Sequence, residues 1–228
     1  MQRRLGLRQL PRRIECCDIS TLGGTLAVGS LVCFTDGEPD KSRYRRYRVR
    51  TLAQPNDYGM MLEVLRRRFR RGLQEGDLPD LLLVDGGKGQ LQVALRALAE
   101  LGIADLEVAA IAKGRREGEV DRFYRPGRKN AISMPAHAPA LHLLQHLRDE
   151  AHRFALAYHR RLRHRQLRHS LLDGIPGLGE KRKAQLLRHF GSLKGLQAAS
   201  LDALTAVPGL PAPVARAVYA ALHPGEVA

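Results

Sequence analysis

The segment Leu81–Gln90, with the sequence LLLVDGGKGQ, is the best guide to the fold of this chain. Its four consecutive aliphatic residues are typical of a strand buried on both faces, in a sheet that helices cover. The glycines that follow permit a tight turn, and apolar residues then recur at helical spacing from Gln90 to Leu101. Asp85 is therefore predicted at the carboxyl end of a central strand, where open α/β sheets place their sites.

Asp85 alone has two interpretations. A carboxylate at the end of a buried strand is costly unless something binds it, and a metal ion or a basic partner is the usual answer. An aspartate that merely caps a turn is equally familiar. One aspartate after one strand does not decide between them.

The composition indicates a nucleic-acid partner. Lysine and arginine number 38 against 23 acidic residues, which gives a net charge of +15 and a pI of about 10.5. Such an excess commonly serves polyanions, although a solvated basic surface without a partner is the alternative. Three cysteines at unsuitable spacing predict neither a disulfide framework nor a zinc site, which fits the cytoplasm. No apolar run is long enough for a membrane span or a signal peptide.

The remaining elements predict an α/β fold. Three strand candidates with short connections come first and indicate an antiparallel meander: Ile14–Ser20, Thr25–Thr35 and Ser42–Val49. After them we expect a helix from Asn56 or Asp57 to about Arg71, the central strand Leu81–Asp85 and its helix Gln90–Leu101. A strand at Glu107–Ala112, a short hairpin around Phe123 and a long helix from Pro139 to about Leu162 follow. This order is that of a ribonuclease H-like mixed sheet with flanking helices. In that arrangement the first and fourth strands are neighbours, which would bring Asp18 next to Asp85.

A second, all-α unit is predicted at the C-terminal end. Gly177-Leu178-Gly179 leads into one helix, and a weaker copy, Gly209-Leu210-Pro211, leads into another, which indicates a tandem helix-hairpin-helix. The expected domains are a basic and frayed or truncated lead-in (residues 1–12), the ribonuclease H-like domain (13–163), a basic linker (164–170) and the tandem helix-hairpin-helix (171–224).

Asp18, Asp85 and His152 form the candidate catalytic and metal site. Two carboxylates on neighbouring strands suit Mg²⁺, and Mn²⁺ accepts an imidazole more readily. His152 lies at the edge of the apolar stripe of the long helix and could be a metal ligand or a general acid/base. The chain has nine histidines, so spacing alone makes an ordinary surface histidine the more common interpretation. His142 and His146 resemble a zinc pair but lack companion ligands.

Candidate phosphate contacts lie after the central strand and in the hairpins. Lys88 could hold a phosphate oxygen, but the spacing of its glycines is not that of a P-loop, so no nucleotide cofactor is expected. The first hairpin offers backbone N–H groups at a helix N-terminus; in the second, Pro211 has no N–H to donate. The predicted DNA-binding residues are Lys88, Gly177, Gly179, Lys181, Arg182, Lys183 and Gly209.

Five stretches, in order along nearly the whole chain, resemble the C-terminal half of the UvrC family, the incision subunit of bacterial nucleotide excision repair. They are Arg13–Ser20, Leu81–Gln90, Ala112–Arg115, Arg148–Ala155 and the paired hairpins. The resemblance implies an endonuclease with an Asp-Asp-His triad, here Asp18, Asp85 and His152, that cuts damaged double-stranded DNA 5′ to the lesion. It also implies a UvrB–DNA complex as partner and UvrA indirectly.

Two departures from the family pattern affect these expectations. Thr21 stands where the family usually has histidine, which removes an accessory histidine but not the triad. The family's N-terminal nuclease half and its UvrB-docking segment have no counterpart here, so recruitment through that segment is expected to be missing. The rival hypothesis is a non-catalytic DNA-binding module, because basic charge and hairpins need no triad.

Overall fold

The computed structural model describes residues 1–228 apart from 23–25, 50–55, 115–119 and 224–228, and it describes no side chain at 22, 26 or 159–171. The chain divides into two compact units, Met1–His159 and Arg160–Ala228. The first unit contains two hydrophobic cores and the second contains one. Within the described residues no helix is both long and apolar enough to cross a membrane.

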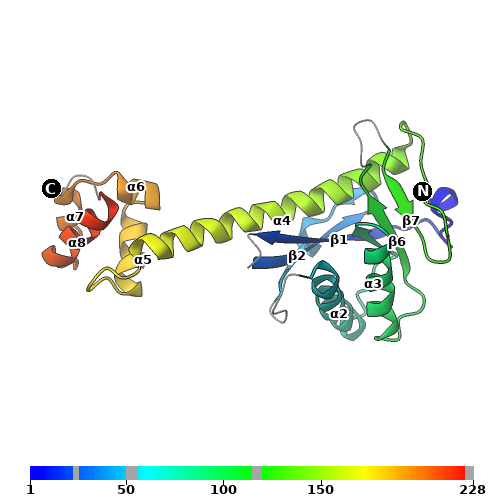
Figure 1. Ribbon diagram of the computed structural model, residues 1–228, viewed down its shortest axis with the longest axis horizontal. Coiled ribbons are helices and arrows are strands. Elements are labelled where there is room, and N and C mark those ends of the chain that lie inside the picture. The colour runs from blue at the N-terminus through cyan, green and yellow to red at the C-terminus, as the bar shows by residue number, and fades with distance from the viewer. Residues whose placement is uncertain (23–25, 50–55, 115–119, 224–228) are drawn as a thin grey trace. The chain divides into compact units, whose positions relative to one another are not determined.

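The first unit is built on one mixed, seven-stranded sheet (Figure 1). Its strands run in the order β3-β2-β1-β5-β6-β7, and β4 also pairs with β2. The pairs β1–β5 and β5–β6 are parallel and the others are antiparallel. The strand bounds are β1 Arg13–Leu22, β2 Leu26–Thr35, β3 Glu38–Pro39, β4 Arg45–Arg48, β5 Leu81–Asp85, β6 Glu107–Ala112 and β7 Arg122–Tyr124. This order confirms the predicted ribonuclease H-like sheet and the adjacency of its first strand and the strand before Asp85.

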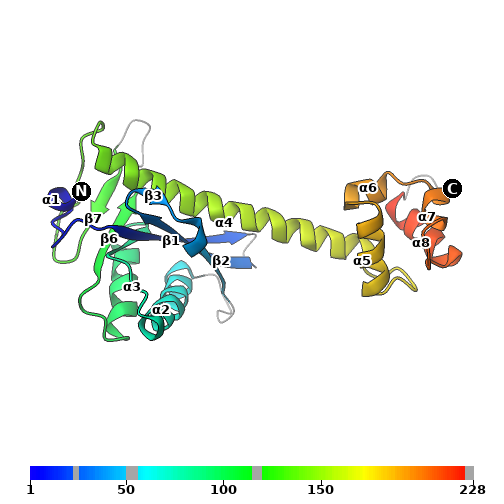
Figure 2. The ribbon, with the colours of Figure 1, turned by 180° about the vertical axis from the view of Figure 1, so that it is seen from behind.

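Helices cover both faces of the sheet. Figures 1 and 2 show α2 (Asp57–Glu75) and α3 (Lys88–Ala99) on one face and α4 (Pro139–Leu172) on the other. Asn56 caps α2, because its side-chain oxygen accepts hydrogen bonds from the backbone N–H groups of Tyr58 and Gly59. Short helical turns, α1 (Gln2–Leu5) and η1 (Lys41–Arg43), complete this unit.

The alternation of side chains along β1 and β5 fixes which residues face which helix layer. In β1, Ile14 and Cys16 belong to the core under α4, whereas Cys17 belongs to the core under α2 and α3. In β5, Leu81 and Leu83 face α4, and Leu82 and Val84 face the other layer. Each fully buried leucine contributes roughly 2 kcal/mol of transfer free energy, so the register that buries these residues is strongly specified.

The N-terminal residues differ from the frayed lead-in that we expected. Leu5 and Leu7 are buried, at 1% and 6% exposure, in the core under α4. Gly6 between them adopts a left-handed conformation with φ 66° that ends α1. The backbone N–H of Arg8 donates to Glu107 at 2.9 Å. Residues 1–12 therefore belong to the first unit, and the expectation of a frayed segment is wrong.

The long helix also extends beyond its predicted end. We expected it to stop near Leu162 and a linker to occupy 164–170, but α4 continues to Leu172. The backbone of the expected linker is therefore helical. Leu172, the last residue of α4, is buried in the core of the second unit. The helices that follow in that unit are α5 Glu180–His189, α6 Leu193–Gln197, α7 Leu201–Thr205 and α8 Ala212–Leu222.

The second unit contains two matching turns before α5 and α8. In each, a leucine N–H donates back three residues, from Leu178 to Ile175 at 3.1 Å and from Leu210 to Val207 at 3.2 Å. The glycine before each leucine has a positive φ, 78° at Gly177 and 75° at Gly209, which a side chain would oppose. The two turns confirm the predicted tandem helix-hairpin-helix.

Candidate active site

Asp18 and Asp85 lie side by side at one edge of the sheet, on the same face. The parallel pairing of β1 with β5 ends with Cys17 opposite Val84, and each aspartate is the next residue on its strand. Because side chains alternate along a strand, both aspartates lie on the face of Cys16 and Leu83, which is covered by α4. The sequence-predicted pair is thus brought together.

His152 reaches the same place from α4. Its Nδ1 lies 3.4 Å from Oδ2 of Asp18, and its side chain is 56% exposed whereas that of Asp18 is 8% exposed. The imidazole therefore stands at the rim of the site, with solvent on one side and a buried carboxylate on the other. The geometry unites the three residues that the sequence analysis selected, and their chemical roles stay predictions.

The electrostatics of the site disfavour two charged aspartates. Burial, and then the nearby charge of Asp18, raise the pKa of Asp85 to about 6, although Arg148 and His152 oppose the rise. A carboxylate whose ionised form is penalised by a like charge gains from any cation that lies between the two groups. The pair is therefore poised to accept positive charge.

A buried arginine network behind the site was not found from the sequence. Nη1 of Arg148 donates to Asp121 at 2.5 Å, and its Nε donates to Asp149 at 2.9 Å. Asp121, 4% exposed, also accepts from the backbone N–H of Gly114 at 3.2 Å and from Gln145 at 2.9 Å. Arg148 lies one helical turn before His152, and this spacing could have identified it as a residue near the site. Asp121 lies in a segment without periodicity, so no sequence pattern indicated its position.

Ser30 connects the helix to the sheet beside the site. It is fully buried opposite Asp18 in the β1–β2 register. Its hydroxyl donates to the carbonyl oxygen of Ala151 at 2.9 Å. Since Ala151 precedes His152, this hydrogen bond holds the part of α4 that carries the imidazole.

Neighbouring side chains bond to and pack tightly against the glycine turn after Asp85. Gly86 has φ 136°, a conformation that strongly favours glycine, and the backbone N–H of Gly87 donates to the side chain of Gln90 at 3.0 Å. A Cβ on Gly89 would lie 2.4 Å from the hydroxyl oxygen of Tyr58. Nζ of Lys88 donates to the carbonyl oxygen of Lys129 at 2.8 Å, so its predicted phosphate contact would require that bond to break.

The donor set fits a divalent cation that keeps most of its water. Across the described residues, no group of three or more His, Cys, Asp or Glu is arranged to hold a metal ion as it stands. Mg²⁺ needs less than that, because it is commonly bound through one or two carboxylates, with waters and substrate phosphates completing the shell. Asp18 and Asp85 supply two such carboxylates.

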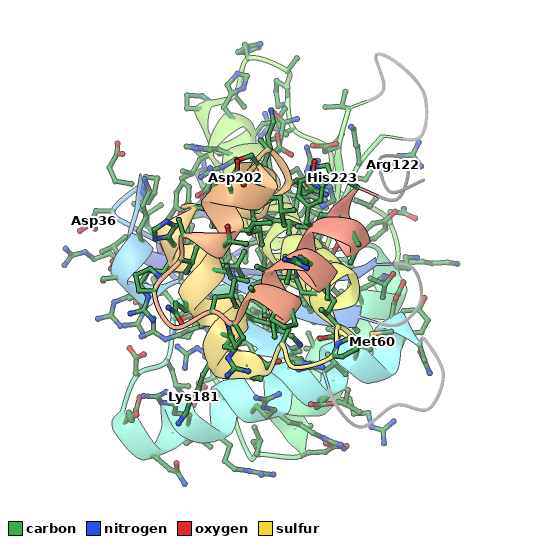
Figure 3. The ribbon with its side chains drawn as sticks, turned by 90° about the vertical axis from the view of Figure 1, so that its left-hand side faces the viewer. Asp36, Met60, Arg122, Lys181, Asp202 and His223 are labelled. Carbon is green, nitrogen blue, oxygen red and sulfur yellow. The ribbon has the colours of Figure 1, made fainter. Side chains whose placement is uncertain are left out.

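The predicted DNA-binding residues of the second unit differ in their surroundings. Lys181 in the first turn of α5 is exposed (Figure 3), and Arg182 donates to the carbonyl oxygen of Gly177 at 2.7 Å. Lys183 is only 13% exposed and pairs with Asp173 and Glu180, so its charge serves the hairpin itself. Gly179 is the N-cap of α5, where Pro211 occupies the equivalent position before α8.

Two family models cover most of the chain. One, described as the UvrC RNAse H endonuclease domain, matches residues 2–156. The other, described as a SAM-like helix-hairpin-helix tandem, matches residues 170–223. The first contains all three candidate active-site residues.

The similar curated proteins carry the name UvrABC system protein C. That of Syntrophotalea carbinolica is 51% identical over 231 residues, which cover 97% of this chain and 38% of that protein. That of Desulfotalea psychrophila is 49% identical over 224 residues, covering 98% of this chain and 37% of that protein. The chain thus spans little more than a third of the length of these relatives. Among solved structures, Ciona intestinalis endonuclease V in complex with DNA is 13% identical, with a TM-score of 0.36 over 49% of this chain and 50% of that one; a likeness this low does not bear on function.

Proposed function

Because the chain belongs to the UvrC family, we propose that it is a divalent-metal-dependent endonuclease of nucleotide excision repair that cuts the damaged strand 5′ to the lesion. The observation that carries the proposal is the convergence of three side chains that are far apart in sequence. Asp18 follows the last residue of β1 that pairs with β5, Asp85 ends β5, and His152 on α4 comes within 3.4 Å of Asp18.

In this proposal Asp18 and Asp85 hold Mg²⁺ or Mn²⁺, with His152 as a further ligand or as the acid/base group. When bound, such an ion lowers the pKa of a water molecule and neutralises charge on the phosphate. The ring of His152 is exposed on one side and lies beside the Asp18 carboxylate on the other, so it can reach both solvent and a group held by that carboxylate. Arg148, through its bond to Asp121, and Ser30, through its bond to Ala151, keep α4 in place.

The second unit would hold the DNA backbone. The turn before α5 presents the N–H groups of a helix start, and Lys181 adds an exposed charge. Contacts of this kind position a protein on DNA without reading its sequence. A UvrB–DNA complex, and UvrA indirectly, are the partners proposed from the family. The free, buried cysteines fit a cytoplasmic protein.

The test is nicking of a lesion-bearing duplex by the whole chain with Mg²⁺ or Mn²⁺, with Asp85→Asn as the matched variant. We expect nicking 5′ to the lesion, none in EDTA, and at least a roughly thousandfold loss in Asp85→Asn, about 4 kcal/mol of barrier. Equal rates for the two proteins would contradict the proposal.

The rival, a DNA-binding module without catalysis, is favoured by the net charge of +15. It predicts binding that weakens with salt and that needs neither a metal ion nor either aspartate. Salt-sensitive binding without nicking in any tested metal would therefore decide for this rival.

A further inference from the structure

An exposed aromatic ring lies beside the glycine turn that follows Asp85. Tyr58, in the first turn of α2, is 50% exposed, and among the described residues it is the only aromatic one of the exposed large apolar side chains. A Cβ on Gly89 would lie 2.7 Å from its Cζ and 2.8 Å from its Cε1, so the end of the ring touches the backbone of α3. Gly89 follows Asp85 by four residues. The ring therefore lies at the same edge of the sheet as the candidate site.

Tyr58 is held at both ends, but its ring is not stacked. At one end its backbone N–H donates to the side chain of Asn56, the N-cap of α2, at 3.1 Å. At the other end the ring rests on Gly89. In the part of the chain that the structure describes, no other ring and no cation stacks on it. A ring that is already restrained loses little conformational freedom when a flat ligand group stacks on it.

The backbone between Asp85 and the ring leaves room for a ligand. A Cβ on Gly87 would have no atom of the described residues within 4 Å, and the extended conformation of Gly87, with φ −103°, is open to other residues. Neither packing nor backbone conformation requires glycine there. A glycine of this kind is typical of a place where a ligand approaches the backbone closely.

The position of Gly87 also matches the path that a bound strand would take. Asp18 and Asp85 lie on the face that α4 covers, whereas α2 and α3 lie on the other face. A strand that reached both the aspartates and the ring of Tyr58 would cross the edge of the sheet between them. Gly87 lies at this crossing, two residues after Asp85.

A nucleobase is the group that fits such a ring. Bases stack on exposed aromatic side chains, and because every base has a π face the contact tolerates any sequence. The net charge of +15 favours a nucleic acid over other flat ligands. Four residues of extended chain span at most about 14 Å, which limits the distance from Asp85 to Gly89. One DNA strand rises about 3.4 Å per nucleotide, so the ring lies about four nucleotides or fewer from a phosphate at Asp85.

We propose that Tyr58 stacks on a base of the DNA strand within about four nucleotides of the phosphate that is cut. This inference rests on the proposed function and adds a base subsite to it. A side chain can stack only on a base whose face is uncovered, so the strand is locally unstacked at this point. The contact holds the strand over the two aspartates without reading its sequence.

The first experiment uses the fact that the sequence contains no tryptophan. Tyr58→Trp is a single-tryptophan protein whose fluorescence reports on the ring position itself. A lesion-bearing duplex is added to the whole chain in EDTA, and we expect loss of tryptophan emission as the base stacks. Leu73→Trp is the matched control, because Leu73 is 46% exposed on the same helix and lies about 22 Å further along it at 1.5 Å per residue. Its emission should stay unchanged.

The second experiment measures what the ring contributes to binding and nicking. Tyr58→Leu keeps apolar bulk but removes the flat ring, so we expect about tenfold weaker DNA binding in EDTA and a KM for nicking raised about tenfold, with little change in kcat. The salt slope of binding should stay the same because no charge is lost. Tyr58→Phe, the conservative variant, should retain the affinity, and Leu73→Ala should change neither binding nor KM.

Melting temperatures separate this role from a purely structural one. A tyrosine that only joined α2 to α3 would lower the melting temperature in Tyr58→Leu and leave the affinity of the folded protein unchanged. That result would overturn the inference. Absence of quenching in Tyr58→Trp, equal quenching in Leu73→Trp, or a Tyr58→Phe variant as impaired as Tyr58→Leu would overturn it as well. Tyr58→Leu and Tyr58→Phe decide the question if Tyr58→Trp does not fold.

Failure of the proposed function would look different. An unmodified chain that binds DNA but does not nick it in any metal ion would refute the endonuclease. The quenching and the affinities in EDTA still test the stacking in that case, so the two failures are distinguishable.

Discussion

Strand β1 carries two buried acids, three residues apart, in opposite circumstances. Glu15, 1% exposed, accepts two hydrogen bonds from Arg68 of α2, at 2.9 and 2.6 Å. Arg68 also donates to the carbonyl oxygen of Asp77 at 2.8 Å. Asp18, 6% exposed, faces a second acid, Asp85, and an imidazole.

The difference distinguishes a structural carboxylate from one that we propose to be functional. Glu15 is matched by a guanidinium that binds it through two parallel N–H bonds, the geometry that best offsets the cost of burying charge. The two aspartates raise each other's electrostatic cost, and a protein keeps such an arrangement mainly where it is used. The pairing of a buried acid is thus more informative about its role than its burial.

The sharpest way to break the comparison is to neutralise each acid in turn. Asp18→Asn should reduce nicking by at least about a thousandfold, because it removes a proposed ligand of the metal ion, while the protein stays folded. Glu15→Gln should leave the nicking rate per folded molecule nearly unchanged. Nicking assays at saturating Mg²⁺, with circular dichroism to count folded protein, measure both; similar activities in the two variants would show that the distinction is false.

Removing the partner of Glu15 should affect the fold more than the chemistry. Arg68→Met leaves a buried carboxylate without its guanidinium, and we expect a loss of about 3 kcal/mol in the free energy of unfolding. Urea denaturation measures it. Arg67→Met on the same helix is the control, because the side chain of Arg67 is 45% exposed and its pair with Glu63 is worth little. Equal losses in both variants would contradict the structural role given to the pair.

The charge repulsion between Asp18 and Asp85 should make the stability of the protein depend on pH. Without metal, the raised pKa of Asp85, about 6 against an ordinary 3.8, means that the folded state binds this proton more tightly than the unfolded state. The ionisation of Asp85 therefore leaves the free energy of unfolding unchanged below about pH 4. Above about pH 6 it lowers that free energy by its full amount, on the order of 2–3 kcal/mol. In EDTA, Asp85→Asn should melt above the unmodified protein at pH 7.5 and level with it at pH 4. A pH-independent difference would mean that this charge repulsion is absent.

The smallest effect is expected at the bond that joins the sheet to α4. Ser30→Ala removes the donor to the Ala151 carbonyl oxygen and should cost about 1 kcal/mol of stability. Nicking should fall only a few-fold, since His152 loses one restraint. Ser30→Cys, with a weak S–H donor of similar size, should lie between Ser30→Ala and the unmodified protein in stability and nicking rate. Unaltered stability and rate in Ser30→Ala would show that this hydrogen bond contributes to neither.

The parts of the site that could be predicted are those with a strong local pattern. Asp85 follows four aliphatic residues and precedes three glycines within four positions, which identifies a strand end. Asp18 followed from the order of the elements, and the pairing of β1 with β5 confirms the adjacency. His152 gave only a position at the edge of a stripe, so its proximity to Asp18 required the resemblance or the coordinates.

The parts that could not be predicted depend on contacts between distant segments. Asp121 meets Arg148 across 27 positions of sequence from a stretch without periodicity. Arg46 alternates with tyrosines in a way that predicts an outer strand, and only the register with Ser30 and the contact with the ring of Phe154 reveal its place. Leu5 lies in a four-residue helix, too short for a periodic signal.

The buried N-terminal residues have a practical consequence for anyone who trims this protein. A first unit that started at Arg13 would lose Leu5 and Leu7 from its core. Each vacated leucine site costs about 2–5 kcal/mol, and a typical domain has only about 5–15 kcal/mol in total. Truncation at the apparent start of the first strand would therefore yield aggregates or inactive material, and loss of nicking in such a preparation would say nothing about the aspartates.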